Sequence, residues 1–566
     1  MPQPPQVPFG APMRHAHFAF SPSYLPLNHG SYGTHPVSVR AAHLALRAEV
    51  EAAPDPFIAL HFASRLAKSR AAVAGLLRCS SDELVFVPNA TTGIDTVLKN
   101  LDWKPGDVVL CYELVYGSVA NGLSWLEEAR GVEPHVIFRE WPIADDDIVK
   151  MMVDTTRQIN AQPGKRVRLA ICDTIISGPG ARVPFERLVP ALQAEGAMVL
   201  VDGAHGIGHV DIDLGVMKPD FFVTNLHKWF FVPRGCAAFY VPKKNQALIR
   251  TSLPTSHGFK PKRPLFLSTP EENAFEELFD FTGTSDTTNY LCVEAALRFR
   301  HDVCGGEASI QQYCRWITER GATIAAEILG THIMNIPGSR MRECNFANIR
   351  MPLELRTEHE VNNRETAEQD GKVDPRHANA VSDWIKHVGC TESGTYFQNF
   401  LYRGNWWWRI SGMIYVEEAD FRKGAHVLKQ LCARNHVPCL GRRSYDETSD
   451  EYNDLPSGPS DIRCQDLTIP DLSADYTQAH WGLDETAVTF VEDISLGACR
   501  IKTRKCPEEK PTQTPGSLDE AHQSETLEVE RFAKAEIHSA HGHGAGGNDE
   551  EPMWNALTEG SEWSTF

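Results

Sequence analysis

Short runs of consecutive apolar residues alternate with amphipathic stretches along most of the chain. The runs ELVFV, DVVLCY, RLAIC, AMVLVD and FFVTN predict buried strands, because strands covered on both faces read as continuous hydrophobic segments. SRLAKSRAAVAGLL and TTGIDTVLKNL repeat their apolar residues at helical spacing and predict helices between those strands. Such runs can also be buried helix segments, but their number and spacing favour a mostly parallel sheet with helices on both faces.

The pattern changes after about Asn289. YLCVEAALRFRHDV and GEASIQQYCRWITERGATIAAEIL predict long helices, ANIRMPL and WWWRISGMIY predict strands, and EEADFRKGAHVLKQLCARN predicts a closing helix. These elements suit a smaller α+β domain. We therefore expect a flexible leader over 1–20, a large α/β domain over 21–290, a small α+β domain over 291–441 with a polar loop at about 354–378, and a largely disordered acidic tail over 442–566.

Composition narrows the functional classes. The formal net charge of −19 argues against binding nucleic acid or an anionic membrane through a general positive field. No apolar run approaches the roughly 18 residues of a membrane span, and the first residues lack the apolar core of a secretory signal. Cysteines such as Cys172 and Cys344 lie in apolar, strand-like runs, which is typical of reduced core thiols and predicts a cytoplasmic protein.

No metal site is expected. The chain has no CxxC pair at zinc-site spacing. His538, His541 and His543 cluster in the stretch HSAHGHGAGG, where a low-complexity tail is a better interpretation than a metal site.

Two strand ends carry residues that are candidates for cofactor binding or catalysis. AMVLVDGAHGIGHVD places Asp202 at the end of a buried strand, where a carboxylate can meet a cofactor's ring nitrogen or simply cap a turn. DFFVTNLHKWFFVP places Lys228 among aromatic residues, where burial would lower its pKa as Schiff-base chemistry requires. A lysine there could also extend to water from a helix end. The spacing of Asp202 and Lys228, with one strand between them, favours a paired site.

A third strand ends before the turn Asn89-Ala90-Thr91-Thr92-Gly93, which opens a helix. Free N–H groups and two hydroxyls at a helix N-terminus can bind a phosphate, although Asn and Thr are also ordinary caps. DFTGTSDTTNY, residues 280–290, is a candidate for a second phosphate contact or a simple polar turn.

These residues resemble the class V aminotransferase (cysteine desulfurase-like) family of fold-type-I pyridoxal-5'-phosphate (PLP) enzymes. The resemblance covers LNHGSYGTHP, VFVPNATTGIDTVL, VYGSVANG, GPGARVPFE, VDGAHGIGHVD, NLHKWFFVPRGCAAFYVP, LPTSHGF and FTGTSDTT, and continues more weakly through WWWRIS. Within the family, the chain looks most like isopenicillin N epimerase-like proteins, and among these the fungal hercynylcysteine sulfoxide lyases of ergothioneine biosynthesis. The resemblance implies a mostly parallel seven-stranded sheet with helices on both faces, a smaller α+β C-terminal domain, and PLP as the cofactor.

The resemblance also implies a role for each matching residue. Lys228 would form the Schiff base and shuttle the α-proton, and Asp202 would pair with the pyridine nitrogen. The remaining cofactor contacts would be Ala90, Thr91, Thr92, Tyr116, Asp173, Thr174, His205 and His227, with Thr284 reaching the cofactor of a second subunit in a homodimer. Tyr116 would also be an acid–base residue, and Asn28, His29 and Arg409 would bind a small amino-acid substrate, Arg409 through its α-carboxylate. Tyr116 could instead merely pack, and Arg409 could pair with a structural acid.

The implied activity is PLP-dependent carbon–sulfur β-elimination on a cysteine S-conjugate or sulfoxide. Epimerisation, transamination or carbon–carbon bond formation in fungal secondary metabolism remain alternatives, cysteine desulfuration is a weaker one, and a catalytically silent binding module is the alternative from another class. One departure bears on substrate: the stretch EVEAAPDPFIALHF lacks the arginines that the lyases resembled here would place near Ala53 and Ala59.

Overall fold

A seven-stranded sheet forms the centre of the larger domain in the computed structural model, which describes residues 4–262, 275–357 and 371–434. The strand order is β1-β9-β8-β7-β4-β2-β3, and every strand runs parallel to its neighbours except β9, which is antiparallel to both β1 and β8. The strands are β1 (Leu84–Val87), β2 (Asp107–Tyr112), β3 (Glu133–Ile137), β4 (Arg166–Asp173), β7 (Met198–Gly203), β8 (Phe221–Asn225) and β9 (Ala237–Tyr240).

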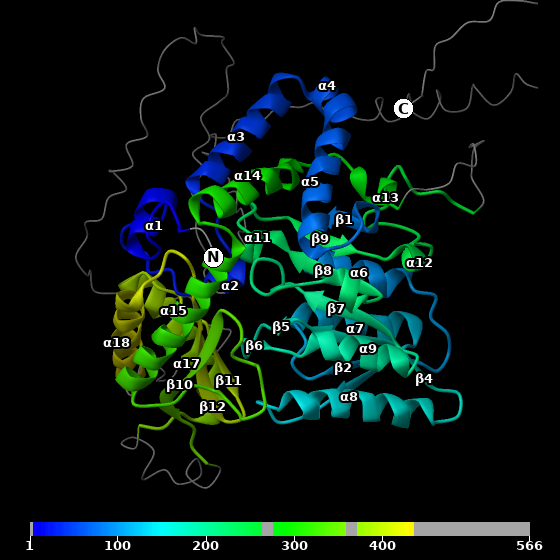
Figure 1. Ribbon diagram of the computed structural model, residues 1–566. Helices are drawn as coiled ribbons and strands as arrows, with labels where there is room; N and C mark the ends of the chain where they lie inside the picture. Colours follow the sequence, from blue (N-terminus) through cyan, green and yellow to red (C-terminus); the bar gives the residue numbers. More distant parts are fainter. Residues whose placement is uncertain (1–3, 263–274, 358–370, 435–566) are drawn as a thin grey trace, which may run out of the picture. The chain divides into compact units, whose positions relative to one another are not determined.

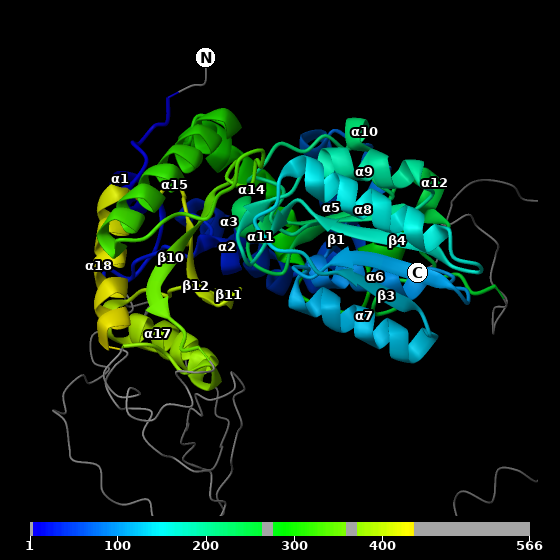
Figure 2. The same ribbon diagram turned by 90° about the horizontal axis from the view of Figure 1, so that it is seen from below.

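Alternate residues of each central strand face two separate cores. Leu169 and Ile171 of β4 pack into one core, whereas Ala170 and Cys172 pack into the other. This alternation follows from the two-residue period of a strand and explains why these segments are apolar throughout. Helices α6 (Ala90–Asn100) and α7 (Gly117–Arg130) cover one face, and α8 (Asp145–Asn160) and α9 (Phe185–Ala194) cover the other (Figure 2).

The smaller domain is an antiparallel three-stranded sheet backed by helices (Figure 1). Its strand order is β10 (Phe346–Glu354), β12 (Asn405–Ser411) and β11 (Asn399–Tyr402). The helices are α15 (Glu307–Leu329), α17 (Ala378–Ser393) and α18 (Glu418–Arg434). The α/β fold class and the additional α+β part predicted from the sequence are confirmed.

Helices α3 (Val37–Ala52) and α5 (Phe62–Leu77) form a hairpin that projects from the larger domain in Figure 1. They are joined by α4 (Pro54–Pro56) and the π-helical turn η1 (Phe57–His61). The short elements are α1 (Ala11–His17), α2 (His29–Tyr32), η2 (Ser81–Glu83), β5 (Ile175–Ile176), β6 (Ala181–Arg182), α10 (Leu214–Met217), α11 (Leu226–Trp229), α12 (Lys243–Gln246), α13 (Glu277–Asp280), η3 (Thr288–Cys292), α14 (Val293–Arg298), η4 (Phe299–Val303) and η5 (Pro375–His377).

Three local expectations differ from the structure. The leader expected to be flexible contains α1, whose Met13 is fully buried, because the apolar side chains of this segment pack against the core. The long helix expected over 290–303 is divided into η3, α14 and η4. The strand expected over 406–415 ends at Ser411, and the following residues turn away with Ile414 and Tyr415 still buried.

The domain boundaries stay a prediction. The chain divides into two units, Met1–Glu447 and Thr448–Phe566, and the second unit, with the three clustered tail histidines, lies outside the described residues. The polar loop predicted at 354–378 falls partly outside them, but its flanks pair through a bridge between Leu355 and Val373. In the described part of the chain, no helix is both long and apolar enough to cross a membrane.

Candidate active site

The strand-end residues predicted to bind the cofactor lie together at one edge of the large sheet. Asp173 ends β4 and lies opposite Asp202 of β7 in the strand register, and β8 then leads directly into α11 with Lys228. Carboxyl ends of parallel strands meet at the same sheet edge, which is where open α/β sheets bind ligands. The fold therefore brings together the two strand-end motifs that the sequence singled out.

Lys228 is partly buried among the residues of the site. Burial lowers its pKa to about 8, with Asp202 acting to raise the pKa and Arg409 acting to lower it further. The lysine's backbone carbonyl accepts a hydrogen bond from His29 Nε2 at 2.7 Å. Gly33, at a φ of +64°, packs so closely on this backbone that a Cβ would come within 1.9 Å of the His227 carbonyl oxygen. Only glycine fits there, which accounts for the final Gly of LNHGSYG.

His205 contacts the lysine directly. Its Nε2 lies 3.2 Å from Lys228 Nζ, and its Nδ1 lies 3.1 Å from Trp229 Nε1. Burial holds the pKa of His205 well below its ordinary value, and the nearby Lys228 charge acts in the same direction. The imidazole is therefore neutral at physiological pH.

Asp202 and Asp173 are two buried carboxyl groups on neighbouring strands. Asp202 Oδ1 accepts the Ala204 N–H at 2.9 Å, and Tyr112 donates its hydroxyl to Asp173 Oδ2 at 2.6 Å. Burial and the neighbouring Asp202 charge raise the pKa of Asp173 well above its ordinary value; burial also raises that of Asp202, but Lys228 opposes this. Since two adjacent buried carboxylates cannot both ionise easily, Asp173 carries the proton and Asp202 keeps the charge.

The predicted phosphate site at the start of α6 is partly used by the protein itself. The Ala90 N–H donates to Asn225 Oδ1, and the Thr92 N–H donates to Asn89 Oδ1, both at 2.9 Å. These bonds remove both amides from the predicted phosphate contacts. The Thr91 N–H has no partner in the described part of the chain, and its hydroxyl lies 3.1 Å from the Ser118 hydroxyl. Thr91, together with Ser118, is thus the part of this predicted phosphate site that remains open to an anion.

His227 lies beside the lysine but is turned toward the chain. Its Nδ1 lies 2.9 Å from the Cys236 carbonyl oxygen and 3.4 Å from the Cys236 backbone nitrogen, so the tautomer decides which of the two it bonds. Burial lowers the pKa of His227 to about 4. In the tautomer that accepts the Cys236 N–H, the proton lies on Nε2 and can be donated to a phosphate, and this assignment stays a prediction.

Arg409 of β12 is a buried cation whose partners among the described residues are all neutral. It donates to the Ser177 hydroxyl at 3.1 Å, to Asn28 Oδ1 at 3.1 Å and to the Ser31 hydroxyl at 2.8 Å, and it stacks over Phe346 at 4.4 Å. Its Nε has no partner, and no carboxylate in the described residues pairs with it. An unpaired buried charge is costly, so this guanidinium is suited to receive an anion.

The remaining predicted residues differ in how far they face the site. His29 has both ring nitrogens engaged, because Nδ1 also lies 2.6 Å from the Tyr415 hydroxyl, so it positions the lysine rather than contacting substrate. Asn28 acts through Arg409. Tyr116 precedes α7 and is half exposed, and the buried Thr174 hydroxyl has no partner among the described residues.

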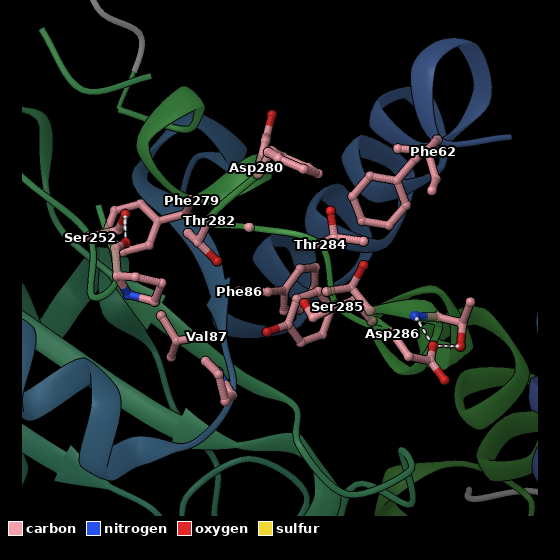
Figure 3. A pocket seen from close by; sticks show the side chains of 18 of the residues that line it. Phe62, Phe86, Val87, Ser252, Phe279, Asp280, Thr282, Thr284, Ser285 and Asp286 are labelled. Carbon is pink, nitrogen blue, oxygen red and sulfur yellow. Dashed lines mark hydrogen bonds between the residues drawn. The ribbon is translucent and has the colours of Figure 1, made fainter. Parts of the chain in front are cut away.

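Thr284 lies apart from the lysine cluster. It lines a cavity of about 430 Å³ with Phe62, Phe86 and Asp286, as Figure 3 shows, and Thr92 borders the same cavity. Neither Lys228 nor Asp202 is among the lining residues. Within one chain, the structure therefore does not bring Thr284 to the lysine.

The sequence did not point to several residues that shape the site. Tyr112 and Trp229 each bond a predicted site residue, but both occur in apolar runs that look like ordinary core. Ser31, Ser177 and Tyr415 are common polar residues whose role depends on contacts distant in sequence. The strong signals came from charged residues at strand ends, and no comparable signal marks these partners.

Comparison with known proteins identifies the family. The sequence model of the family Aminotransferase class-V matches residues 57–333. An L-cysteine desulfhydrase-like protein of Epichloe uncinata is 37% identical over 79% of this chain and 98% of its own length. The hercynylcysteine sulfoxide lyase of Schizosaccharomyces pombe is 30% identical over 74% of this chain and 96% of its own length.

The chain belongs to the class V aminotransferase family. Among solved structures, the cystine C–S lyase C-DES has a TM-score of 0.55 at 18% identity and covers 72% of this chain and 97% of its own length, which supports the fold. The family uses PLP, and the site fits this cofactor: Asp202 is a buried carboxyl group, Lys228 is a partly buried amine, and Thr91 offers an N-terminal helix amide without a partner among the described residues.

The pKa of Lys228 predicts how its amine responds to pH. Since the pKa is lowered to about 8, the neutral and reactive form increases as pH rises through 8, well below the range of an ordinary lysine. Competitive acetylation of the full-length chain, after the cofactor is removed with hydroxylamine, measures this midpoint by peptide mass spectrometry. Exposed Lys243, whose pKa is raised by its hydrogen bond with Asp82, serves as the internal reference. A Lys228 midpoint equal to that of Lys243 would contradict the burial argument.

Proposed function

We propose that this enzyme is a PLP-dependent carbon–sulfur β-lyase acting on a cysteine S-conjugate or its sulfoxide. The observation that carries the proposal is the partly buried amine of Lys228, in contact with His205 and under the influence of the Asp202 charge, in a chain that aligns with nearly the full length of a desulfhydrase-like protein and a sulfoxide lyase. The bound cofactor supplies an electron sink for the pair released at the substrate's α-carbon.

The residues divide the work of β-elimination. Lys228, as a neutral amine, removes the α-proton, and the Cβ–S bond then breaks with its electron pair leaving on sulfur. Released 2-aminoacrylate hydrolyses to pyruvate and ammonia. Asp202, as the charged member of the buried pair, holds the proton on the ring nitrogen, and Arg409 receives the α-carboxylate. The Arg409 contact would orient the substrate so that its α-hydrogen faces the lysine.

Cysteine desulfuration is the less favoured reaction, because the candidate thiol is inaccessible. Cys344 lies two residues before β10, is fully buried, and has a pKa raised to about 11 by burial. A desulfurase needs a thiolate that reaches the substrate sulfur. Persulfide formation on Cys344 would overturn this assignment.

A substrate panel tests the proposed reaction. The purified enzyme is incubated with hercynylcysteine sulfoxide, simple cysteine sulfoxides, cysteine S-conjugates and cysteine, and pyruvate and the sulfur product are measured. We expect pyruvate in a ratio of one to one with the released sulfur product. Cofactor-loaded enzyme that yields no pyruvate from any of these compounds would contradict it, and racemised substrate without elimination would establish an epimerase instead. The panel also decides whether hercynylcysteine sulfoxide, and with it an ergothioneine pathway, is the natural assignment.

We further propose a homodimer in which Thr284 completes the site of the partner subunit. The cavity around Thr284 does not contain its own lysine. Large apolar side chains are exposed on the projecting hairpin and beside this cavity: Val37, Leu44, Ile58, Leu60 and Phe281. A subunit interface over the hairpin and this cavity would cover these side chains.

Mixed dimers test this arrangement. Thr284→Glu places a negative charge against the phosphate, and Lys228→Ala removes the amine, so each homodimer should be inactive. When the two chains are co-expressed with different tags, each mixed dimer has one site with both native residues and should show about half of the wild-type activity. No recovery in the mixed dimer, or a monomer in solution, would contradict the proposal.

A further inference from the structure

A short series of hydrogen bonds next to Lys228 ends in a group that can only donate. Trp229 Nε1 lies 3.1 Å from His205 Nδ1, and His205 Nε2 lies 3.2 Å from Lys228 Nζ. An indole N–H has no lone pair to offer, so His205 Nδ1 must be the accepting nitrogen. In the neutral ring the single proton then lies on Nε2, which faces the lysine.

We propose that Trp229 is a positioning residue that fixes the tautomer of His205 and thereby favours the neutral form of the Lys228 amine. With the Nε2–H directed at Nζ, the neutral amine accepts a hydrogen bond through its lone pair. An ammonium group in the same place would oppose one donor with another. The neutral amine is the form that attacks a carbonyl and takes up a proton, so the functional meaning of this inference rests on the proposed role of Lys228.

Neither aromatic ring is free to turn away. Trp229 is fully buried, its carbonyl oxygen accepts from Arg300 Nη1 at 2.8 Å, and its indole stacks on the His209 ring at 3.9 Å. His205 is also buried and packs edge-on against Phe346. The direction of the Trp229 N–H is therefore set by the surrounding core rather than by the lysine.

The other charges near Lys228 do not by themselves determine whether its amine is protonated. Asp202 on β7 favours the ammonium form, whereas Arg409 on β12 disfavours it. His227 on α11 has a pKa lowered to about 4, and His29 on α2 a pKa lowered to about 3, both by burial, so these rings are neutral at physiological pH. Burial remains the main cause of the lowered pKa, and with Asp202 and Arg409 opposed, the direction of the His205 proton adds to it.

Trp229→Phe tests the inference, because it removes the N–H and keeps an aromatic ring. His205 can then move its proton to Nδ1 and accept from an ammonium, so the acetylation midpoint of Lys228 in the full-length, cofactor-stripped chain should rise by about one pH unit. Replacing Trp229 by benzothienylalanine, which keeps the shape of the indole but lacks the N–H, gives the same measurement without a cavity. The matched control is Trp406→Phe, since Trp406 is equally buried and its indole donates to Ser382 in the smaller domain.

A double-variant cycle separates this role from a purely structural one. His205→Ala alone should raise the midpoint by a similar amount, and adding Trp229→Phe to it should change nothing more. An unchanged midpoint in both Trp229 replacements would overturn the inference, as would a Trp229 effect that persists without His205. The acetylation readout does not depend on lyase activity, so the proposed reaction can fail while this inference stands.

Discussion

Lys228→Ala is expected to lower kcat/KM for carbon–sulfur cleavage by at least about 10³-fold, because it removes both the covalent anchor of the cofactor and the group that takes the α-proton. The amine lies in the site, in contact with His205, and has a pKa lowered to about 8, so no exposed lysine can replace it. The loss should appear in kcat, since the α-carboxylate contact at Arg409 is untouched. Steady-state pyruvate release, with cofactor content measured by absorbance, checks this prediction.

Two controls separate lost chemistry from lost structure. Lys228→Arg keeps a long cation but cannot act as a neutral amine, so it should be nearly as inactive. A small primary amine such as methylamine, added to Lys228→Ala, should restore part of the activity by entering the space that the side chain leaves. If the Ala variant retains a tenth of the activity while folded, the proton must be removed by another group, and Tyr116 is then the candidate.

The sequence predicts a site residue only where a local motif marks it, and it does not predict contacts between residues that are distant in the sequence. Lys228 and Asp202 each follow a buried strand, and strand ends of a parallel sheet meet at one edge, so local pattern alone places them together. The Ala90 amide was assigned to phosphate because its motif has the right local form. In the structure it bonds Asn225, which is 135 residues away, and no local pattern reports such a contact.

The same contrast applies to the fold. Central strands such as β2 and β8 are buried on both faces and are evident as apolar runs. The edge strand β3, with the sequence EPHVI, is only partly buried and contains polar residues and a proline, so its pattern is weak. In α1, one fully buried Met13 anchors a segment whose prolines suggested a flexible leader.

The chemical role of a site residue depends more on the residues it contacts than on its own residue type. Asp173 was predicted as a cofactor contact, but its hydrogen bond with Tyr112 and its place beside Asp202 give it a different character. By holding a proton, it leaves the negative charge to Asp202. His205 likewise takes its function from the Trp229 indole. Such roles follow from burial and geometry, which are properties of the folded chain.

Arg409→Gln is expected to raise KM about 10²-fold with a much smaller change in kcat. The guanidinium is buried and stacks on Phe346, and its partners among the described residues are all neutral. A substrate carboxylate would therefore be its first anionic partner. Loss of a buried, hydrogen-bonded charge pair costs about 2–5 kcal/mol, which makes a hundredfold effect a conservative expectation. Burial lowers the pKa of Arg409 only to about 10, so the cation persists at neutral pH.

Substrate analogues decide whether Arg409 binds the carboxylate or merely supports the fold, since it also holds Asn28 and Ser31 in place. A cysteamine conjugate, which lacks the α-carboxylate, should be a poor substrate of the wild type and should lose little further in the Gln variant. Arg409→Lys should fall between, because it keeps the charge without the two-pronged geometry. If the Gln variant is impaired equally toward both kinds of substrate, Arg409 acts through its serine and asparagine contacts, and the carboxylate must be bound elsewhere.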